Sequence, residues 1–569
     1  MNYTYDNDSR LTQLTDPTGT YQFTFDNMGR LTNTTTSYSF LTGRNFTTAY
    51  GYDAASNRTG FTDPESGATS YAYDTLNRLQ TLTPPAAISG AFGFGYDALS
   101  RRTSLTRANS VNTSYSYDNL SRLLSVTHAK SGTTLDGATY AVDNAGNRTS
   151  RTPQPSGTAT NFGYDNIYEL LSATQGGTNT ESYTYDPVGN RLTSLSGSYG
   201  YNTSNELTSS PTATYTYDNN GNTLTKVVGS NTTTYAWDFE NRMTSVTLPG
   251  SGGTVSFKYD PFGRRIYKSS SSGTSVFAYD GDNLVEETNA SGTAVARYSD
   301  GLNIDEPLAM LRSSVTSFYH ADGLGSVTSL SNSSGAIAQT YTFDSFGNQT
   351  ASSGSLTNPF RYTARESDSE TGLYYYRARY YDQNVGRFLG EDPIRWTDGH
   401  SFYLYVKNRP GFFRDPSGRI AIGPGFSPEC VTDLLNALNI IKDRIKTRPA
   451  CTCWFLSHGI HAPLDALLAF PFTINFDPKM NDVKGEKDTL AYVWPGDPFN
   501  IHVTTKGCNS GPTHLAQDIV HELAHIALGH ATDLDPISKK EHNDVRLAES
   551  ACGFAIQMQT PPQTFVFHY

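Results

Sequence analysis

Charged residues and long apolar runs are scarce in this 569-residue sequence. Only 17% of the residues are charged, the net charge is −12, and no basic run is present, which argues against a surface that binds nucleic acid. No apolar stretch approaches the roughly 20 residues of a membrane-spanning helix. Residues 1–6 contain neither a basic nor an apolar segment, so we expect no signal peptide. The length allows several domains.

Cysteine is absent until late in the chain. The five cysteines are Cys430, Cys451, Cys453, Cys508 and Cys552. Because their number is odd, they cannot all pair within the chain, and Cys-Thr-Cys is too closely spaced for an ordinary zinc knuckle. We expect buried thiols, with one disulfide as the alternative. Nine of the twelve histidines also follow Arg419, so the composition predicts a domain boundary there.

The first half of the chain is a repeat array. An aromatic residue followed by aspartate recurs, mostly about every 20 residues, and a variant of Asn/Gly-Arg-Leu-Thr often comes next. Alternating aromatics are typical of a strand, and the Asp-Asn-x-Gly-Asn segments form turns. Each unit is therefore predicted to be a strand, a tight turn and a return strand that stacks on its neighbours. The aromatic residues are Tyr5, Phe25, Tyr52, Tyr73, Tyr96, Tyr117, Tyr164, Tyr185, Tyr217, Trp237, Tyr259 and Tyr279.

The array and the segment after it resemble the tyrosine-aspartate repeat proteins of the Rhs family. We expect repeats over residues 1–310 and an Rhs-associated core over 311–419. The resemblance implies a mainly β shell, in which a continuous sheet spirals into a hollow cocoon around a C-terminal toxin; teneurins and the C subunits of insecticidal toxin complexes share the repeat. Relatives usually run longer at the N-terminus, so we expect an incomplete shell. The core signatures are residues 319–326, 358–362, 372–382 and 386–393.

Three arginines stand among the tyrosines of the core. Arg377, Arg379 and Arg387 are predicted to stack on aromatic rings or to form ion pairs.

The core ends in a junction that is self-cleaving in relatives. The resemblance implies that Asp392 and Asp415 act as an aspartyl-protease-like pair and cut between Arg419 and Ile420, although relatives generally have leucine where Arg419 stands. Two close carboxylates can share a proton, so that one acts as base toward water and the other as acid toward the amide. The alternative is that both Asp-Pro dipeptides are ordinary turns.

A His-Glu-x-x-His motif lies near the C-terminus, in an apolar stretch with helical periodicity. His521 and His525 fall one turn apart on one face of the predicted helix and can bind one Zn²⁺ ion. Glu522 can act as the general base that deprotonates zinc-bound water. The alternative is a surface helix that merely carries histidines.

The third zinc ligand determines the class of enzyme. A histidine six residues after His525 would indicate a metzincin, but Ala531 occupies that position. Together with the segment around Glu549, the motif resembles ImmA/IrrE-type gluzincins, in which a glutamate from a following helix completes the site. That resemblance implies Glu549 as the ligand. Its rivals are His530, His542 and Asp544.

Other residues would support the zinc ligands. Asp518 is a candidate to orient a metal-bound histidine. The sequence offers several candidates to stabilise the oxyanion: His514, His542 and Tyr492.

Residues 420–569 are expected to form a small α+β zincin-like domain. Helices are predicted over 430–445 and 544–558 and strands over 489–493 and 500–505, with a turn at 495–498. The strand over 500–505 is expected to bind an extended peptide by strand addition.

The leading hypothesis is a polymorphic toxin: a shell that cuts itself after Arg419 and delivers a zinc metallopeptidase to a protein substrate in target cells. The resemblance implies a bacterial effector made in the cytoplasm, a cognate immunity protein and delivery machinery such as a type VI-like system. One alternative is a structural or adhesive cell-surface protein with a degenerate C-terminal domain. Another is a zinc hydrolase acting on a non-peptide substrate.

Overall fold

The computed structural model describes residues 1–393 and 401–419, together with three strands between residues 473 and 504. It divides into two compact units, which are treated separately below. The first consists of residues 1–301, 305–391 and 403–418, and the second of residues 302–304, 392–402 and 419–569. No helix among the described residues is long and apolar enough to cross a membrane.

The first unit begins with a 17-stranded sheet. Each strand pairs antiparallel with the next one in the sequence. The strands are β1 Asn2–Tyr5, β2 Leu11–Asp16, β3 Gly19–Phe25, β4 Leu31–Tyr38, β5 Asn45–Tyr52, β6 Arg58–Thr62, β7 Ala68–Tyr73, β8 Leu79–Thr83, β9 Phe92–Tyr96, β10 Arg102–Thr106, β11 Val111–Tyr117, β12 Leu123–Lys130, β13 Thr133–Val142, β14 Arg148–Gln154, β15 Thr160–Tyr164, β16 Leu170–Gln175 and β17 Thr178–Ser182.

Two further sheets continue the same up-and-down order. The three-stranded sheet is β18 Thr184–Tyr185, β19 Arg191–Ser194 and β20 Gly197–Ser198. The 16-stranded sheet is β21 Gly200–Tyr201, β22 Leu207–Ser209, β23 Thr214–Tyr217, β24 Thr223–Val228, β25 Asn231–Trp237, β26 Met243–Thr247, β27 Thr254–Tyr259, β28 Arg265–Ser270, β29 Gly273–Asp280, β30 Asn283–Thr288, β31 Ala294–Asp300, β32 Pro307–Arg312, β33 Val315–Ala321, β34 Val327–Ser331, β35 Ile337–Phe343 and β36 Gln349–Ser353. Residue 310, the expected end of the repeats, lies within β32.

The three sheets, β1–β36, are called the wall below. A five-residue turn that begins with aspartate closes hairpins at one end of this wall. In the turn Asp26–Arg30, Oδ1 of Asp26 accepts the N–H groups of Met28 and Arg30, both at 2.9 Å, and Oδ2 accepts Nε of Arg30 at 2.6 Å. The N–H of Asp26 donates to the carbonyl of Arg30 at 2.9 Å. The carboxylate therefore supplies acceptors for the turn's backbone. We call this structure a YD turn.

Several YD turns are bonded to the turn that follows. Nη1 of Arg30 donates to the carbonyl of Asp53, in the following turn, at 2.8 Å, and its guanidinium lies 4.9 Å from the ring centre of Tyr52. Nη1 of Arg78 donates likewise to the carbonyl of Asp97 at 3.1 Å. One arginine thus fixes its own turn and positions its neighbour through a charge-assisted bond and a cation–π contact.

The tyrosine of the repeat donates a hydrogen bond to the preceding repeat, whereas the arginine bonds to the following one. The hydroxyl of Tyr52 donates to the carbonyl of Leu31, in the preceding repeat, at 2.9 Å. Burying the ring while the hydroxyl finds an acceptor suits tyrosine better than phenylalanine. The same kind of bond is made by Tyr73, Tyr96, Tyr117, Tyr164, Tyr185, Tyr259 and Tyr279.

The predicted strand–turn–strand unit is confirmed, but the turns do not follow the Tyr-Asp dipeptides completely. Asp280 pairs directly with Asn283 in a shorter turn. The longer turn also occurs where no Tyr-Asp dipeptide marks it, beginning at Asp143, Asn202, Asp322 and Asp344.

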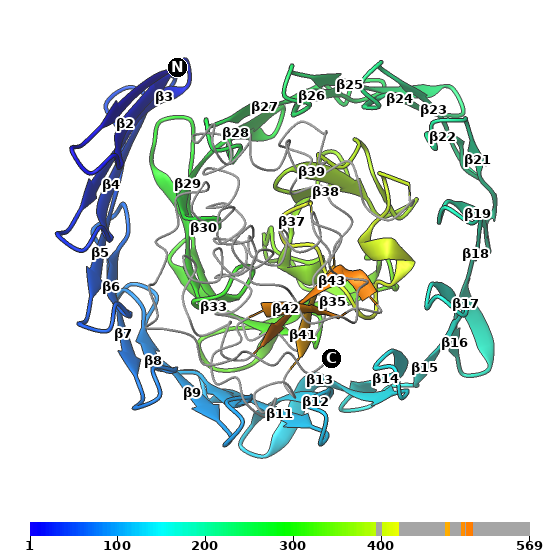
Figure 1. The fold of residues 1–569 in the computed structure, drawn as a ribbon, viewed down its shortest axis with the longest axis horizontal. Coiled ribbons are helices and arrows are strands. Elements are labelled where there is room, and N and C mark those ends of the chain that lie inside the picture. The colour runs from blue at the N-terminus through cyan, green and yellow to red at the C-terminus, as the bar shows by residue number, and fades with distance from the viewer. Residues whose placement is uncertain (394–400, 420–472, 478–490, 495–496, 505–569) are drawn as a thin grey trace, which may run out of the picture. The chain divides into compact units, whose positions relative to one another are not determined.

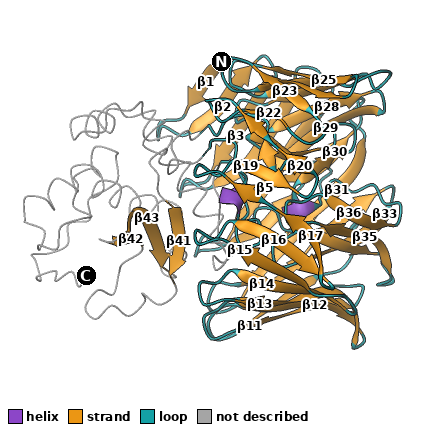
Figure 2. Ribbon diagram, turned by 90° about the vertical axis from the view of Figure 1, so that its right-hand side faces the viewer, coloured by secondary structure: helices purple, strands orange, loops and turns teal. Residues whose placement is uncertain are grey.

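The wall curls so that its later strands lie inside its earlier ones. Figure 1 shows β29, β30 and β33 inside β4–β9, and Figure 2 shows the same wall from the side. The hydroxyl of Tyr38 donates to the carbonyl of Phe277 at 2.9 Å, and Nδ2 of Asn109 donates to Oγ of Ser331 at 2.7 Å. Residues more than 200 positions apart therefore meet across two layers of sheet, as a spiral requires.

A small four-stranded sheet fills the interior of the same unit. It consists of β37 Glu366–Asp368, β38 Leu373–Tyr376, β39 Arg379–Asp382 and β40 Arg387–Phe388, with short 3-10 helices η1 Tyr362–Ala364 and η2 Val406–Asn408 nearby in the sequence. Leu373, Tyr375 and Tyr380 of this sheet pack in one apolar cluster with Phe257 and Tyr259 of the wall. The single-copy segment is thus the core against which the repeats pack.

The second unit contains a three-stranded mixed sheet. Its strands are β41 Thr473–Asp477, β42 Ala491–Trp494 and β43 Asp497–Thr504, in the order β41-β43-β42. Both predicted strands are confirmed, but β43 begins within the expected turn, and β41 was not predicted. Because β43 pairs with a strand on each side, strand addition to residues 500–504 is excluded. The expected helices over 430–445 and 544–558 and all five cysteines lie outside the described residues.

The YD turn predicts a measurable loss of stability. Replacing Asp97 by alanine removes the acceptor of three hydrogen bonds, from the N–H groups of Leu99 and Arg101 and from Nε of Arg101. We expect the free energy of unfolding of the full chain to fall by about 1–3 kcal/mol in a denaturant titration.

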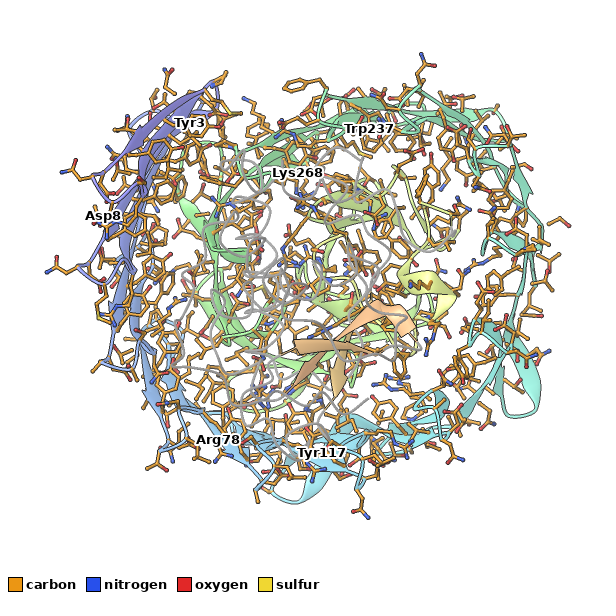
Figure 3. The ribbon with its side chains drawn as sticks, viewed as in Figure 1. Tyr3, Asp8, Arg78, Tyr117, Trp237 and Lys268 are labelled. Carbon is orange, nitrogen blue, oxygen red and sulfur yellow. The ribbon has the colours of Figure 1, made fainter. Side chains whose placement is uncertain are left out.

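The matched control is Asp8→Ala. The Asp8 side chain is 72% exposed and points away from the wall in Figure 3, so its loss should cost less than about 0.5 kcal/mol. Equal losses in the two variants would contradict this account of the turn.

Candidate functional site

The segment before the expected cleavage point runs along the row of YD turns. The hydroxyl of Tyr403 donates to the carbonyl of Gly221 at 2.7 Å, and Nδ2 of Asn408 donates to the carbonyl of Gly189 at 2.7 Å. Arg409 continues the path, with Nη2 donating to Oδ1 of Asn147 at 3.0 Å. Residues 403–418, which we call the junction segment, are therefore held by single side chains bonded to several successive repeats.

A buried carboxyl group helps to hold the junction segment. Oε1 of Glu169 accepts Nδ2 of Asn408 at 2.8 Å. Burial raises the pKa of the Glu169 carboxyl to about 7, and the neighbouring Asp165 adds to the increase. Near neutral pH this contact is therefore sensitive to protonation.

The core arginines behave as predicted. Nη1 of Arg387 donates to Oδ1 of Asn190 at 3.0 Å, and its guanidinium lies 4.8 Å from the ring centre of Tyr201 and 5.1 Å from that of Tyr403. Arg379 stacks on Phe388 with its central carbon 3.6 Å from the ring centre. Stacking and polar bonding together allow these cations to be buried.

Asp415 lies at the end of the junction segment and is only 3% exposed. Its Oδ2 is 3.3 Å from Nη2 of Arg379, and its Oδ1 accepts a hydrogen bond from the Oγ hydroxyl of Ser417 at 3.2 Å. Nε of Arg379 also donates to the carbonyl of Gly418 at 2.5 Å. One guanidinium therefore connects the Asp415 carboxylate to the backbone immediately before the expected cleavage point.

The other expected cleavage residues fall in the second unit. Asp392 is buried, and its N–H donates to the carbonyl of Phe402 at 3.0 Å. Arg419 is partly buried. Ile420 lies outside the described residues. The expected zinc-site residues also lie outside them: Asp518, His521, Glu522, His525, His542 and Glu549. Within the described part of the chain, no three His, Cys, Asp or Glu side chains form a group suited to a metal ion.

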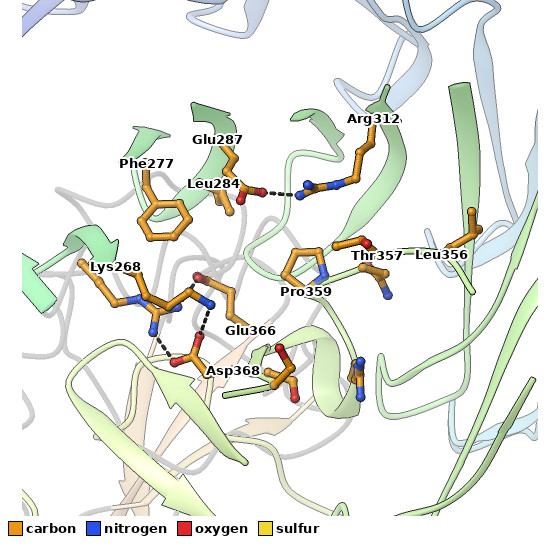
Figure 4. A pocket seen from close by; sticks show the side chains of 15 residues that line it. Lys268, Phe277, Leu284, Glu287, Arg312, Leu356, Thr357, Pro359, Glu366 and Asp368 are labelled. Atoms are coloured by element: carbon orange, nitrogen blue, oxygen red, sulfur yellow. Dashed lines mark hydrogen bonds and ion pairs between the residues drawn. The ribbon is translucent and has the colours of Figure 1, made fainter. Parts of the chain in front are cut away.

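A cavity of about 300 Å³ opens between the wall and the core (Figure 4). Arg265 pairs with Glu366 at 2.8 Å and also with Asp368, and Lys268 pairs with Asp368 at 3.2 Å. These charges are neutralised within the lining, so we assign them a structural role.

Sequence reasoning missed the residues that hold the junction segment. Glu169 and Asn147 occupy ordinary repeat positions, and Asn408 follows the core signatures. The neighbouring sequence gives no signal of their role, because the residues they bond to lie more than 200 positions away.

Comparison with known proteins agrees with this fold. Residues 147–400 match the family model described as Teneurin YD-shell, and residues 96–134 match that described as RHS Repeat. The crystal structure of TcdB2-TccC3-Cdc42 contains a similar fold, with a TM-score of 0.62 and 20% identity, over 72% of this chain and 24% of that one. This likeness concerns the fold alone.

Two curated relatives are toxins or nucleases by name. The tRNA nuclease WapA of Bacillus subtilis (strain 168) is 30% identical over 270 residues, which are 43% of this chain and 11% of that protein. Toxin protein Tse5 of Pseudomonas aeruginosa is 33% identical over 103 residues, which are 18% of this chain and 8% of that protein. The chain thus matches about a tenth of the length of these relatives. The fold and the matches agree on a YD-repeat shell.

The contact between Glu169 and Asn408 predicts a pH dependence. A carboxyl whose pKa is raised on folding contributes stability that is fully present below its unfolded pKa and is lost as the pH rises through the folded value, here about 7. Glu169→Gln mimics the protonated form. We expect the variant to melt at a higher temperature than the wild type at pH 8 and at nearly the same temperature at pH 4.

The control is Glu240→Gln, because Glu240 lies on an exposed turn and pairs with Arg242 at the surface. Its difference from the wild type should not show the same rise between pH 4 and pH 8. A Glu169→Gln difference that is independent of pH would contradict the assignment.

Proposed function

We propose that this chain is the carrier and effector of a polymorphic toxin. The shell and core, up to residue 419, hold an effector formed by residues 420–569 and release it by cutting the bond between Arg419 and Ile420. The observation that carries the proposal is the position of Asp415: this buried carboxylate is held by Arg379 of the core, a few residues before the junction with a domain of different composition.

The cleavage step is a hydrolysis that needs only water and two carboxyl groups. One of Asp392 and Asp415 takes a proton from water, whose oxygen bonds to the carbonyl carbon of Arg419. The other carboxyl group protonates the departing nitrogen of Ile420 as the C–N bond breaks. The products are a carboxylate at Arg419 and a free amine at Ile420.

The proposed effector activity is zinc-dependent peptide hydrolysis. His521, His525 and Glu549 form a donor set that suits Zn²⁺, and such an ion, when bound, activates water at neutral pH. Glu522 would take up the proton of that water. The strands β42 and β43, which precede the His-Glu-x-x-His motif in the sequence, support an α+β domain. An extended peptide would add to β41 or β42, since β43 has no free edge.

The proposed partners follow from the proposed activity. A peptidase active in the producing cell requires a cognate immunity protein, and a shell of this size requires delivery machinery to reach a target cell. The name of the relative WapA gives the contrasting possibility, hydrolysis of tRNA, and the test below separates the two.

The proposal predicts the fate of the purified chain. We expect intact-mass analysis to show cleavage of the wild type after Arg419, and a single uncut chain for Asp392→Asn and for Asp415→Asn. The released fragment should contain about one zinc per molecule and cleave peptides but not tRNA. Glu522→Ala should still cut at the junction and retain zinc, yet lose the peptidase activity.

Asp368→Asn is the matched control, because Asp368 is another buried aspartate of the core and pairs with Arg265. Its chain should still be cut. An uncut wild type would contradict the junction assignment, and a zinc-independent nuclease activity of the fragment would contradict the peptidase.

A further inference from the structure

The hairpin between β38 and β39 contains a strained arginine. Tyr376 pairs with Arg379, so only Arg377 and Ala378 form the loop. The φ angle of Arg377 is +57°, in the left-handed region where such loops favour glycine or asparagine. A side chain with this backbone cost points to a local function.

The guanidinium of Arg377 joins three parts of the first unit. Its Nη2 lies 2.8 Å from Oδ1 of Asp305 and donates to the carbonyl of Asp282 at 3.0 Å. Its Nη1 donates to the carbonyl of Pro416, in the junction segment. Asp305 is buried and is also paired with Arg365, so the anchor of Arg377 is itself fixed.

Three consecutive hairpin residues bind three consecutive carbonyl groups of the junction segment. Arg377 binds that of Pro416, the N–H of Ala378 donates to that of Ser417 at 3.2 Å, and Nε of Arg379 donates to that of Gly418 at 2.5 Å. The next carbonyl along the chain belongs to Arg419, the proposed site of cleavage. We call residues 377–379 the carbonyl clamp.

Gly418 shows that the clamp and the segment are closely fitted. Its φ angle is +69°, and a Cβ atom there would lie 2.1 Å from the carbonyl oxygen of Tyr376. No side chain fits in that space without moving backbone, so the glycine allows the segment to approach the hairpin.

We propose that Arg377 and Arg379 are positioning residues that set which peptide bond the chain cuts and how fast. This inference rests on the proposed function, self-cleavage after Arg419. Holding the carbonyl groups of residues 416–418 fixes the register of the chain, and a reacting bond held in register reacts faster than a mobile one. The three carbonyl groups that the clamp binds precede the cleaved bond, so its proposed role is orientation.

The test follows cleavage of the full chain over time during cell-free synthesis. Arg377→Gly is the informative variant, because glycine relieves the backbone strain while removing the guanidinium. We expect a chain that still folds, because Asp305 keeps its pair with Arg365, but that cuts itself about 10- to 100-fold more slowly. Guanidinium ion at a non-denaturing concentration should restore part of the rate, whereas urea should not. Arg379→Lys should also be slow, because lysine cannot span Asp415 and Gly418.

The matched control is Arg312→Ala, which removes another partly buried arginine–carboxylate pair, with Glu287. It should cut at the wild-type rate and at the same bond. If the wild type cuts and Asp415→Asn does not, but Arg377→Gly cuts at the wild-type rate and position, the clamp is overturned and the proposed function stands. If the wild type is never cut, both are overturned.

Discussion

The wall depends on one interaction, the aspartate carboxylate at the start of each YD turn. This side chain accepts the N–H groups that the turn would otherwise leave without backbone partners, as Asp26 does for Met28 and Arg30. Where an arginine stands four positions later, as Arg30 does, the same carboxylate orients it, and that arginine reaches the next turn. The carboxylate that binds the N–H groups of its own turn thus also links that turn, through the arginine, to the next repeat. Successive links of this kind allow the sheet to extend as far as the repeat pattern extends in the sequence.

The continuing sheet creates a second constraint, because its inner face must be covered. Part of that face is covered by the later strands of the same wall, and part by the single-copy core, with Phe257 and Tyr259 packing on Tyr375 and Tyr380. Polar groups that are buried in this way need partners from the opposite layer, as Asn109 finds in Ser331. Contacts along the wall therefore repeat from one turn to the next, whereas contacts between its layers depend on individual pairs of residues.

This difference explains what the sequence could predict. Tyr52-Asp53 predicts its turn because the residues that make the contacts are neighbours in the sequence. Asp143 makes the same turn without an aromatic residue before it and was missed, because the carboxylate rather than the ring closes the turn. The central place of β43 was also missed, because strand order depends on β41, whose alternating segment Thr473–Asp477 was not predicted as a strand.

For the candidate site, the sequence could name residues but could not predict the contacts that they make. Asp415 was found by resemblance, whereas its burial and its contact with Arg379 were not predicted and come from the structure. Asp305 was not found, although it anchors Arg377 from 72 positions away. Neither Asp305 nor the strain at Arg377 leaves a local signal, because both arise from how the core folds onto the wall.

The position of the clamp bears on the outcome of the proposed cleavage. The three carbonyl groups that it binds, those of Pro416, Ser417 and Gly418, precede the bond between Arg419 and Ile420. The proposed hydrolysis of that bond would leave these three hydrogen bonds in place. The junction segment likewise keeps its bonds to Asn147, Gly189 and Gly221. The proposed cut would therefore remove the covalent link to residues 420–569 without breaking any of these hydrogen bonds.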